Sequence, residues 1–299
     1  MSDDSSPHGT FVFYHYTPSL PAAIILTIVF ILLTSYHLTL LLRKKTYYFI
    51  PFILGGLFEA IGYIGRALSS RDKDALGPYI MQTLLLLVAP ALFAASVYMT
   101  LGRIILAVEG EERSLVRRKW LTKIFVAGDV LSFLMQSAGG GMMAKADSPT
   151  SASTGQNVIV GGLVVQVLFF AFFILVAIVF HRRLLLSPTR LSTTPSLPWQ
   201  KHLIALYGIS TLILIRSIFR IVEYVQGNDG YLLRSEVFLY VFDACLMVGV
   251  MVWSAVVYPA EITGVAKKNG GYGEVVVMEE GMGYRGHSGM VAVAGEERK

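Results

Sequence analysis

Seven stretches of this chain are long and apolar enough to cross a membrane, and this pattern constrains the fold more than any other feature. A spanning helix needs about 20 apolar residues, because each residue advances about 1.5 Å through a hydrocarbon core roughly 30 Å thick. We therefore predict an all-α fold, a polytopic membrane protein built as a bundle of seven transmembrane helices. The predicted spans are Leu20–Leu42, Tyr48–Leu68, Pro78–Leu101, Leu121–Ala144, Val158–Phe180, Leu203–Val225 and Glu236–Tyr258.

The composition supports a single membrane domain with short tails. Of the 299 residues, 54% are hydrophobic and 15% are charged, against about 25% charged in ordinary soluble domains. We predict an extracellular N-terminal segment (1–19), a seven-helix membrane domain (20–258) and a cytoplasmic tail (259–299), which is rich in Gly and Glu and should be disordered. The single cysteine, Cys245, excludes an intramolecular disulfide, and we expect it to pack as a small hydrophobe inside the last helix.

The distribution of Lys and Arg between alternate loops predicts the orientation, since cytoplasmic loops carry the excess of positive charge. One set of loops holds twelve basic residues and the other holds four. This asymmetry predicts an N-terminus outside the cytoplasm and a C-terminus inside. The richer set is Arg43, Lys44, Lys45, Arg113, Arg117, Arg118, Lys119, Lys123, Arg182, Arg183, Arg190 and Lys201; the poorer set is Arg71, Lys73, Lys145 and Arg234.

Polar side chains within the predicted spans are the candidate functional residues, because charge at the bilayer centre costs from about 3 to above 10 kcal/mol. Glu59 and Arg66 share one helix face but lie about 10 Å apart by helical rise, so each needs a partner on another helix or water. Asp129 and Gln136 repeat this two-turn spacing. The predicted substrate-binding set is Glu59, Arg66, Gln82, Asp129, Gln136, Gln166, Arg216, Arg220, Glu223, Glu236 and Asp243.

Two interpretations of these polar residues stay open at this point. They could be structural ion pairs, for example Arg220 with Glu223 on one helix or Arg216 with Asp243 across two helices. The number of basic and acidic groups at one depth favours instead an amphiphile head-group site or proton-linked carboxylates. His37 could relay protons, although a satisfied interior histidine is the more common situation.

Other sequence patterns predict helix packing or argue against particular functions. Adjacent glycines at 55–56, 139–141 and 161–162 predict close helix contacts. The sequence has no His/Cys/carboxylate set with metal-site spacing, no nucleophile elbow and no P-loop, so we predict that the protein is not an enzyme and binds no cofactor or metal. No basic run is interleaved with aromatics, so we expect membrane lipids and amphiphilic small molecules as partners and no nucleic acid.

A series of short motifs follows one another along the predicted helices. They are Tyr16-x-Pro18-Ser19, Glu59-x-x-Gly62-Tyr63-x-x-Arg66, Ala89-Pro90 with Ala94-Ala95, Tyr98 and Leu101-Gly102-Arg103, Asp129-x-x-Ser132-x-x-x-Gln136-x-x-Gly139-Gly140-Gly141, Gly162-Leu163-x-x-Gln166, Arg216-Ser217-x-Phe219-Arg220-x-x-Glu223, and Glu236-x-x-x-Tyr240-x-x-Asp243. In this order they resemble the fungal lipid-translocating exporter family, the seven-helix membrane proteins named for resistance to aminocholesterol.

This resemblance implies export or leaflet-to-leaflet movement of amphiphiles such as sphingoid bases, phospholipids or sterol-like toxic compounds, and a contribution to stress resistance at the plasma membrane. It supplies no catalytic residues. The family's last helix often closes with His-Pro, whereas this chain has Tyr258-Pro259, so no role of that histidine carries over. Without a nucleotide-binding motif, uphill transport would need an ion gradient or a partner.

Three functional hypotheses follow. In a translocator, Arg66, Arg216 and Arg220 would attract an anionic or hydroxylated head group, and Asp243, Glu59 or Asp129 would bind a cationic one. A seven-helix receptor or sensor of lipid stress would instead signal through its cytoplasmic loops. In a purely structural organiser, the charges would only hold the helices together.

Overall fold

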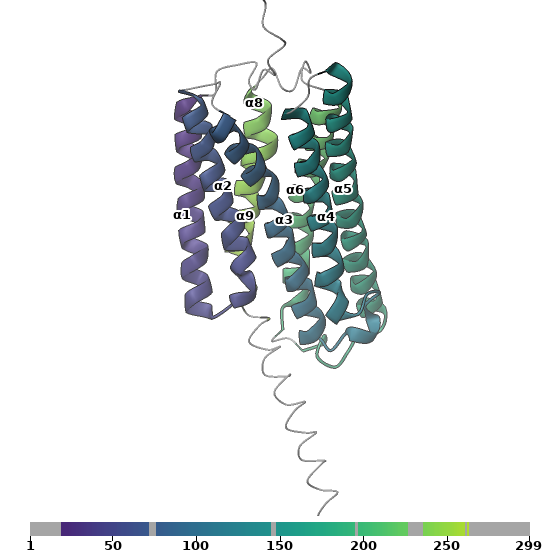
Figure 1. Ribbon diagram of the computed structural model, residues 1–299. Coiled ribbons are helices and arrows are strands. Elements are labelled where there is room, and N and C mark those ends of the chain that lie inside the picture. The colour runs from purple at the N-terminus through teal and green to yellow at the C-terminus, as the bar shows by residue number, and fades with distance from the viewer. Residues whose placement is uncertain are drawn as a thin grey trace, which may run out of the picture.

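The computed structural model describes residues 19–71, 76–144, 148–194, 197–226, 236–260 and 262. Within these ranges the chain is all-helical, and seven helices are long and apolar enough to cross a membrane. They stand side by side as one upright bundle (Figure 1). The helices are α1 (Leu20–Lys44), α2 (Ile50–Ser69), α3 (Leu76–Ala107), α4 (Arg118–Ala144), α5 (Pro149–Leu186), α6 (Trp199–Val225), α8 (Glu236–Leu239) and α9 (Leu246–Val256), with 3-10 turns η1 (Tyr47–Phe49) and η2 (Glu111–Arg113) and a π-helix η3 (Tyr240–Cys245).

The seven predicted spans are confirmed, and several helices are longer than predicted, α3 and α5 most of all. Helix α3 continues to Ala107 and helix α5 begins at Pro149, nine residues before the predicted start. The Ser148 side chain accepts a hydrogen bond from the Ser151 amide at 3.2 Å, which caps α5, and Pro149 occupies the first turn. The predicted N-terminal segment and tail lie almost entirely outside the described residues.

Close approach between neighbouring helices depends on glycines, as the sequence predicts. A Cβ on Gly55 of α2 would lie 2.8 Å from the Phe93 ring on α3, and one on Gly139 of α4 would lie 2.5 Å from the Gly155 carbonyl oxygen on α5. Small residues let helix backbones pack closely inside a bilayer. The prediction is wrong for Gly140 and Gly141, because a Cβ there would meet open space.

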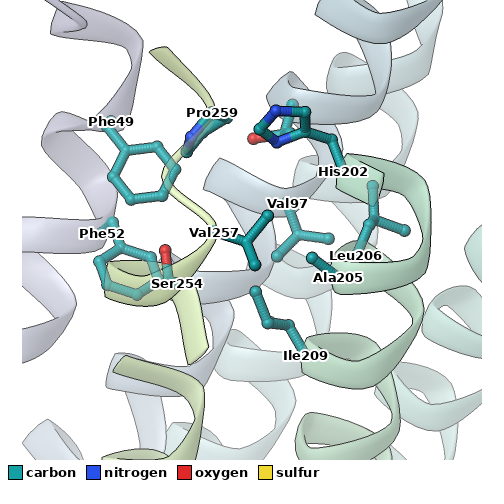
Figure 2. Close-up of a pocket in the computed structure, with 11 residues that line it drawn as sticks. Phe49, Phe52, Val97, His202, Ala205, Leu206, Ile209, Ser254, Val257 and Pro259 are labelled. Atoms are coloured by element: carbon teal, nitrogen blue, oxygen red, sulfur yellow. The ribbon is translucent and has the colours of Figure 1, made fainter. Parts of the chain in front are cut away.

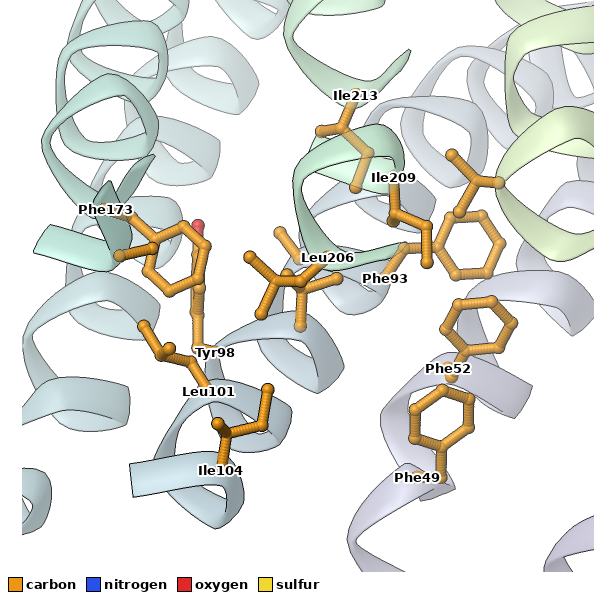
Figure 3. Packing of buried hydrophobic residues seen from close by; sticks show 14 of the residues in the cluster. Phe49, Phe52, Phe93, Tyr98, Leu101, Ile104, Phe173, Leu206, Ile209 and Ile213 are labelled. Atoms are coloured by element: carbon orange, nitrogen blue, oxygen red, sulfur yellow. The ribbon is translucent and has the colours of Figure 1, made fainter. Parts of the chain in front are cut away.

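Aromatic side chains dominate one part of the core. The rings of Phe93, Phe52 and Phe49 follow one another with centroids 4.7 and 4.6 Å apart, and Figure 3 shows them as a column. We call these three residues the aromatic column. A second aromatic group lies between α3, α4 and α5, where the Tyr98 ring packs 4.6 Å from that of Phe173.

The expectation for Cys245 is wrong, because its side chain is exposed on the surface of the bundle. Asp243 and Ala244 face the interior. A residue two positions after Asp243 points to the opposite side of the helix, toward lipid.

Candidate functional site

Three ion pairs lie inside the bundle, toward the end at which α1 begins. Arg216 of α6 pairs with Asp243 of η3 at 2.5 Å, and their side chains are only 3% and 1% exposed. Arg220 pairs with Glu223 on the same helix at 2.6 Å. Both pairings were among the structural alternatives that the sequence suggested, and both are confirmed. The third pair joins Arg66 to Glu236.

The π-helix places Asp243 for its pairing. Six residues of the last spanning helix, Tyr240–Cys245, form π-type turns between α8 and α9. Such wide turns are rare and occur often at functional sites. Nothing in the residue pattern predicted this irregularity.

Glu236 joins three parts of the chain at the end of the bundle. Its carboxylate accepts hydrogen bonds from Arg66 of α2 at 2.6 Å, from the Tyr240 hydroxyl at 2.6 Å and from the Ser19 amide before α1 at 2.8 Å. Arg66 also lies over the Tyr240 ring, with its guanidinium carbon 5.2 Å from the centroid. The predicted need of Arg66 for a partner on another helix is therefore confirmed.

Glu59 differs from the other acids of this region. It is completely buried, and neither carboxyl oxygen has a hydrogen-bond partner among the described residues. Its carboxyl lies within electrostatic range of Asp243, Arg216 and Arg220. We refer to Glu59, Arg66, Arg216, Arg220, Glu223, Glu236 and Asp243 together as the central charge cluster.

Gln82 is buried on α3, which packs against α2, one of the helices of the central charge cluster. A Cβ on Gly65, one residue before Arg66, would lie 3.2 Å from the backbone nitrogen of Gln82. The backbone of Gln82 therefore lies at the α2–α3 interface, beside the residue that precedes Arg66.

Three of the predicted residues belong to a separate site. Asp129 and Gln136 of α4 and Gln166 of α5 line a cavity of about 120 Å³ bordered by α3, which we call the lateral cavity. The Gln136 amide donates to the Ser132 hydroxyl at 2.6 Å and to the Gln166 side-chain oxygen at 3.3 Å. Helix α3 borders both sites, because the Leu86 carbonyl accepts a hydrogen bond from Arg216 and the next residue, Leu87, lines the cavity.

Several polar residues at these sites were absent from the predicted set. Ser132 lines the lateral cavity, and Tyr240 binds Glu236. Each lies three or four residues from a predicted residue, on the same helix face, so helical spacing could have found them. Tyr63, whose buried hydroxyl has no partner within the described ranges, lies four residues from Glu59.

A small cavity lies at the other end of the bundle. Figure 2 shows Phe49, Phe52, His202 and Ser254 around it, and its volume of about 30 Å³ leaves room for one water. His37 is buried nearby against Phe52, and its Nε2 bonds the Met251 carbonyl at 3.0 Å. His37 is thus held by packing and one hydrogen bond, as expected of an interior histidine.

The described residues contain no group of three or more His, Cys, Asp or Glu side chains that could hold a metal ion. The polar groups of the central charge cluster and the lateral cavity are guanidinium, carboxylate, amide and hydroxyl groups. These groups bind charged and hydroxylated partners through hydrogen bonds and charge attraction.

The fold and these sites define an integral, multi-pass membrane protein with fixed charges inside a seven-helix bundle. The chain belongs to the family of RTA1 like proteins, whose model matches residues 52–265. This confirms the fungal resistance family that the motifs indicated.

The chain is 39% identical over 287 residues to protoporphyrin uptake protein 1 of Saccharomyces cerevisiae, an alignment that covers 83% of this chain and 92% of that protein. It is 37% identical over 274 residues to protein RTA1 of the same yeast, covering 83% and 85%. It is 26% identical over 275 residues to the yeast sphingoid long-chain base transporter RSB1, covering 81% and 72%. No solved structure matches the chain.

Proposed function

We propose that this protein moves amphiphilic lipids across the membrane, with the central charge cluster as the polar path for their head groups. The observation that carries the proposal is the set of three ion pairs inside the bundle, two of them buried, which brings fixed charges from α2, α6 and the last spanning helix to one region. Relatives named for sphingoid base transport and protoporphyrin uptake support it, because both cargoes combine a large apolar body with polar groups.

Charge compensation explains how such a cluster would work. A head group that crosses the hydrocarbon core alone would leave its charge without a partner, at a cost of several kcal/mol. A head group that carries both charges can insert into such a pair, with its phosphate beside Arg216 and its ammonium group beside Asp243. Every buried charge then keeps a partner of opposite sign, so the barrier falls without an external source of energy.

The aromatic column provides the barrier in the proposed path. Phe52 precedes Glu59 by seven residues on α2, so it lies about two turns from the cluster, toward the small cavity at the other end. With the column closed, a head group in the cluster has no polar route onward. Separation of Phe52 from Phe93 would open one.

The proposed setting is the plasma membrane, with the N-terminus outside. The excess of Lys and Arg in the loops at the end where α1 finishes supports this orientation, and the motif resemblance supports the location. We propose a transport protein and not an enzyme, and the names of the relatives support this.

Reconstitution tests the proposal. The full chain in unilamellar vesicles should move a fluorescent sphingoid base or phospholipid between leaflets faster than protein-free vesicles do. Equal rates with and without folded protein would contradict it, and ligand-dependent recruitment of a cytoplasmic partner by the same preparation would then favour the sensor hypothesis.

A further inference from the structure

The lateral cavity is a second polar site, and its charge is arranged differently from that of the central cluster. Asp129 is 5% exposed and lines the cavity, yet no basic side chain among the described residues pairs with it. A carboxylate in a membrane interior that has the Tyr98 hydroxyl beside it but no basic partner is costly. A cationic ligand would remove this cost.

The hydrogen bonds around Asp129 leave acceptors open. The Ser132 hydroxyl donates to the Gly162 carbonyl at 2.8 Å, and the Gln136 amide donates to Ser132 and Gln166. In contrast, Asp129 Oδ2 and Gln136 Oε1 are both buried, and neither accepts a hydrogen bond within the described part of the chain. A site with two open acceptors, one of them charged, fits a ligand with several donors and a positive charge.

The cavity also has an apolar wall and an exposed edge. Leu87, Ala91 and Phe133 line it together with Val130, a residue that is 51% exposed on the outer surface of the bundle. Its volume of about 120 Å³ is several times what one water needs. A small head group fits inside while its alkyl chain remains among the lipid tails beside Val130.

We propose that the lateral cavity binds the primary ammonium head group of a single-chain amphiphile, with Asp129 as its counter-ion. The three N–H donors of an ammonium group match the open oxygens of Asp129 and Gln136, and a phosphate would be repelled by the carboxylate. This inference rests on the proposed function, since it adds a second head-group site to the same protein. The proposal gives Asp129 a different role from Glu59 and Asp243, whose carboxyl groups lie near guanidinium groups.

Photolabelling of the purified full chain in lipid nanodiscs tests the site. The probe is hexadecylamine with a diazirine in its alkyl chain, and the competitors are unlabelled hexadecylamine and hexadecanol. We expect labelled peptides from α3 and α4 around the cavity, and competition by the amine but not by the alcohol. Equal competition by both, or label confined to the helices of the central cluster, would overturn the proposal.

Two variants and a control sharpen this test. Asp129→Asn keeps the side-chain size and removes the charge, and should lower labelling about tenfold or more. Ala91→Leu keeps the charge and fills the cavity, and should also lower labelling, so the test remains decisive if Asp129→Asn folds poorly. Glu112→Gln removes an exposed acid elsewhere and should leave labelling unchanged. Full labelling of both folded cavity variants would overturn the proposal.

The outcomes separate this site from the proposed function. Amine-specific labelling that depends on Asp129, together with no lipid movement in vesicles, would support the site and contradict the translocator. Lipid movement in vesicles together with labelling independent of Asp129 would support the translocator and contradict the lateral-cavity site.

Discussion

Arg216 and Asp243 form an ion pair that ties helix α6 to the π-helix of the last span, with an Nε to Oδ1 distance of 2.5 Å. The same guanidinium donates to the Leu86 carbonyl of α3. One side chain thus connects three spanning helices by charge and hydrogen bonding. Because the pair is buried, each partner depends on the other for compensation of its charge.

Removal of one partner should therefore be more harmful than removal of both. Asp243→Leu or Arg216→Leu alone should lower the free energy of unfolding by about 3–5 kcal/mol, since an unpaired buried charge remains. The double variant Arg216→Leu/Asp243→Leu should recover most of the loss. Denaturant unfolding of the purified protein in mixed micelles measures these differences.

The exposed pair of Arg118 and Glu111 is the control for that experiment, because its side chains are 38% and 55% exposed. Glu111→Ala should change the stability by less than about 1 kcal/mol. Additive losses in the Arg216→Leu/Asp243→Leu variant would contradict the account of mutual compensation.

Adjacent glycines in α4 should respond very differently to the same substitution. Gly139→Ala should reduce the melting temperature and the folded yield, because its Cβ would lie 2.5 Å from the Gly155 carbonyl oxygen. Gly141→Ala should be neutral or slightly stabilising, because a Cβ there meets open space and alanine favours helix by about 0.5–1 kcal/mol. Similar melting temperatures for the two variants, measured by thermal aggregation, would contradict the described α4–α5 contact.

Truncation of the aromatic column should open the proposed path. Phe52→Ala should raise the rate of lipid movement in vesicles, since Phe52 packs between Phe49 and Phe93. Phe125→Ala removes an equally buried ring from the second aromatic group and should not raise it. If both variants move lipid at the wild-type rate, the column is not the barrier.

The predicted orientation can be tested on intact cells. Short epitope tags placed before Met1 and after Lys299 should be detected outside the cell at the N-terminus and only after permeabilisation at the C-terminus. Detection of the C-terminal tag on intact cells would show that the loop charges do not determine the orientation.

The spans were predictable because a helix in lipid must satisfy its own backbone hydrogen bonds, so hydropathy over about 20 residues is sufficient evidence. The pair Arg220–Glu223 was equally predictable from the sequence, since side chains three residues apart on a helix lie next to each other. Arg216–Asp243 was one suggested pairing among several, and the structure confirms it.

Other features depend on which helices are neighbours and how each is rotated, which no local pattern contains. The pairing of Arg66 with Glu236, 170 positions apart, belongs to this class. So does the separation of Asp129, Gln136 and Gln166 from the central charge cluster, which a single list of polar residues had merged. The exposure of Cys245 was missed because a lone cysteine in an apolar run gives no sign of its helix face.

The rate of lipid movement by the double variant Arg216→Leu/Asp243→Leu, at folded content equal to that of the wild type, tests the central claim most directly. The account predicts that this variant remains folded and that movement of fluorescent sphingoid base and phospholipid falls to the protein-free level, while Glu111→Ala moves both at the wild-type rate. Wild-type movement by the folded double variant would contradict the claim that the buried charges form the path.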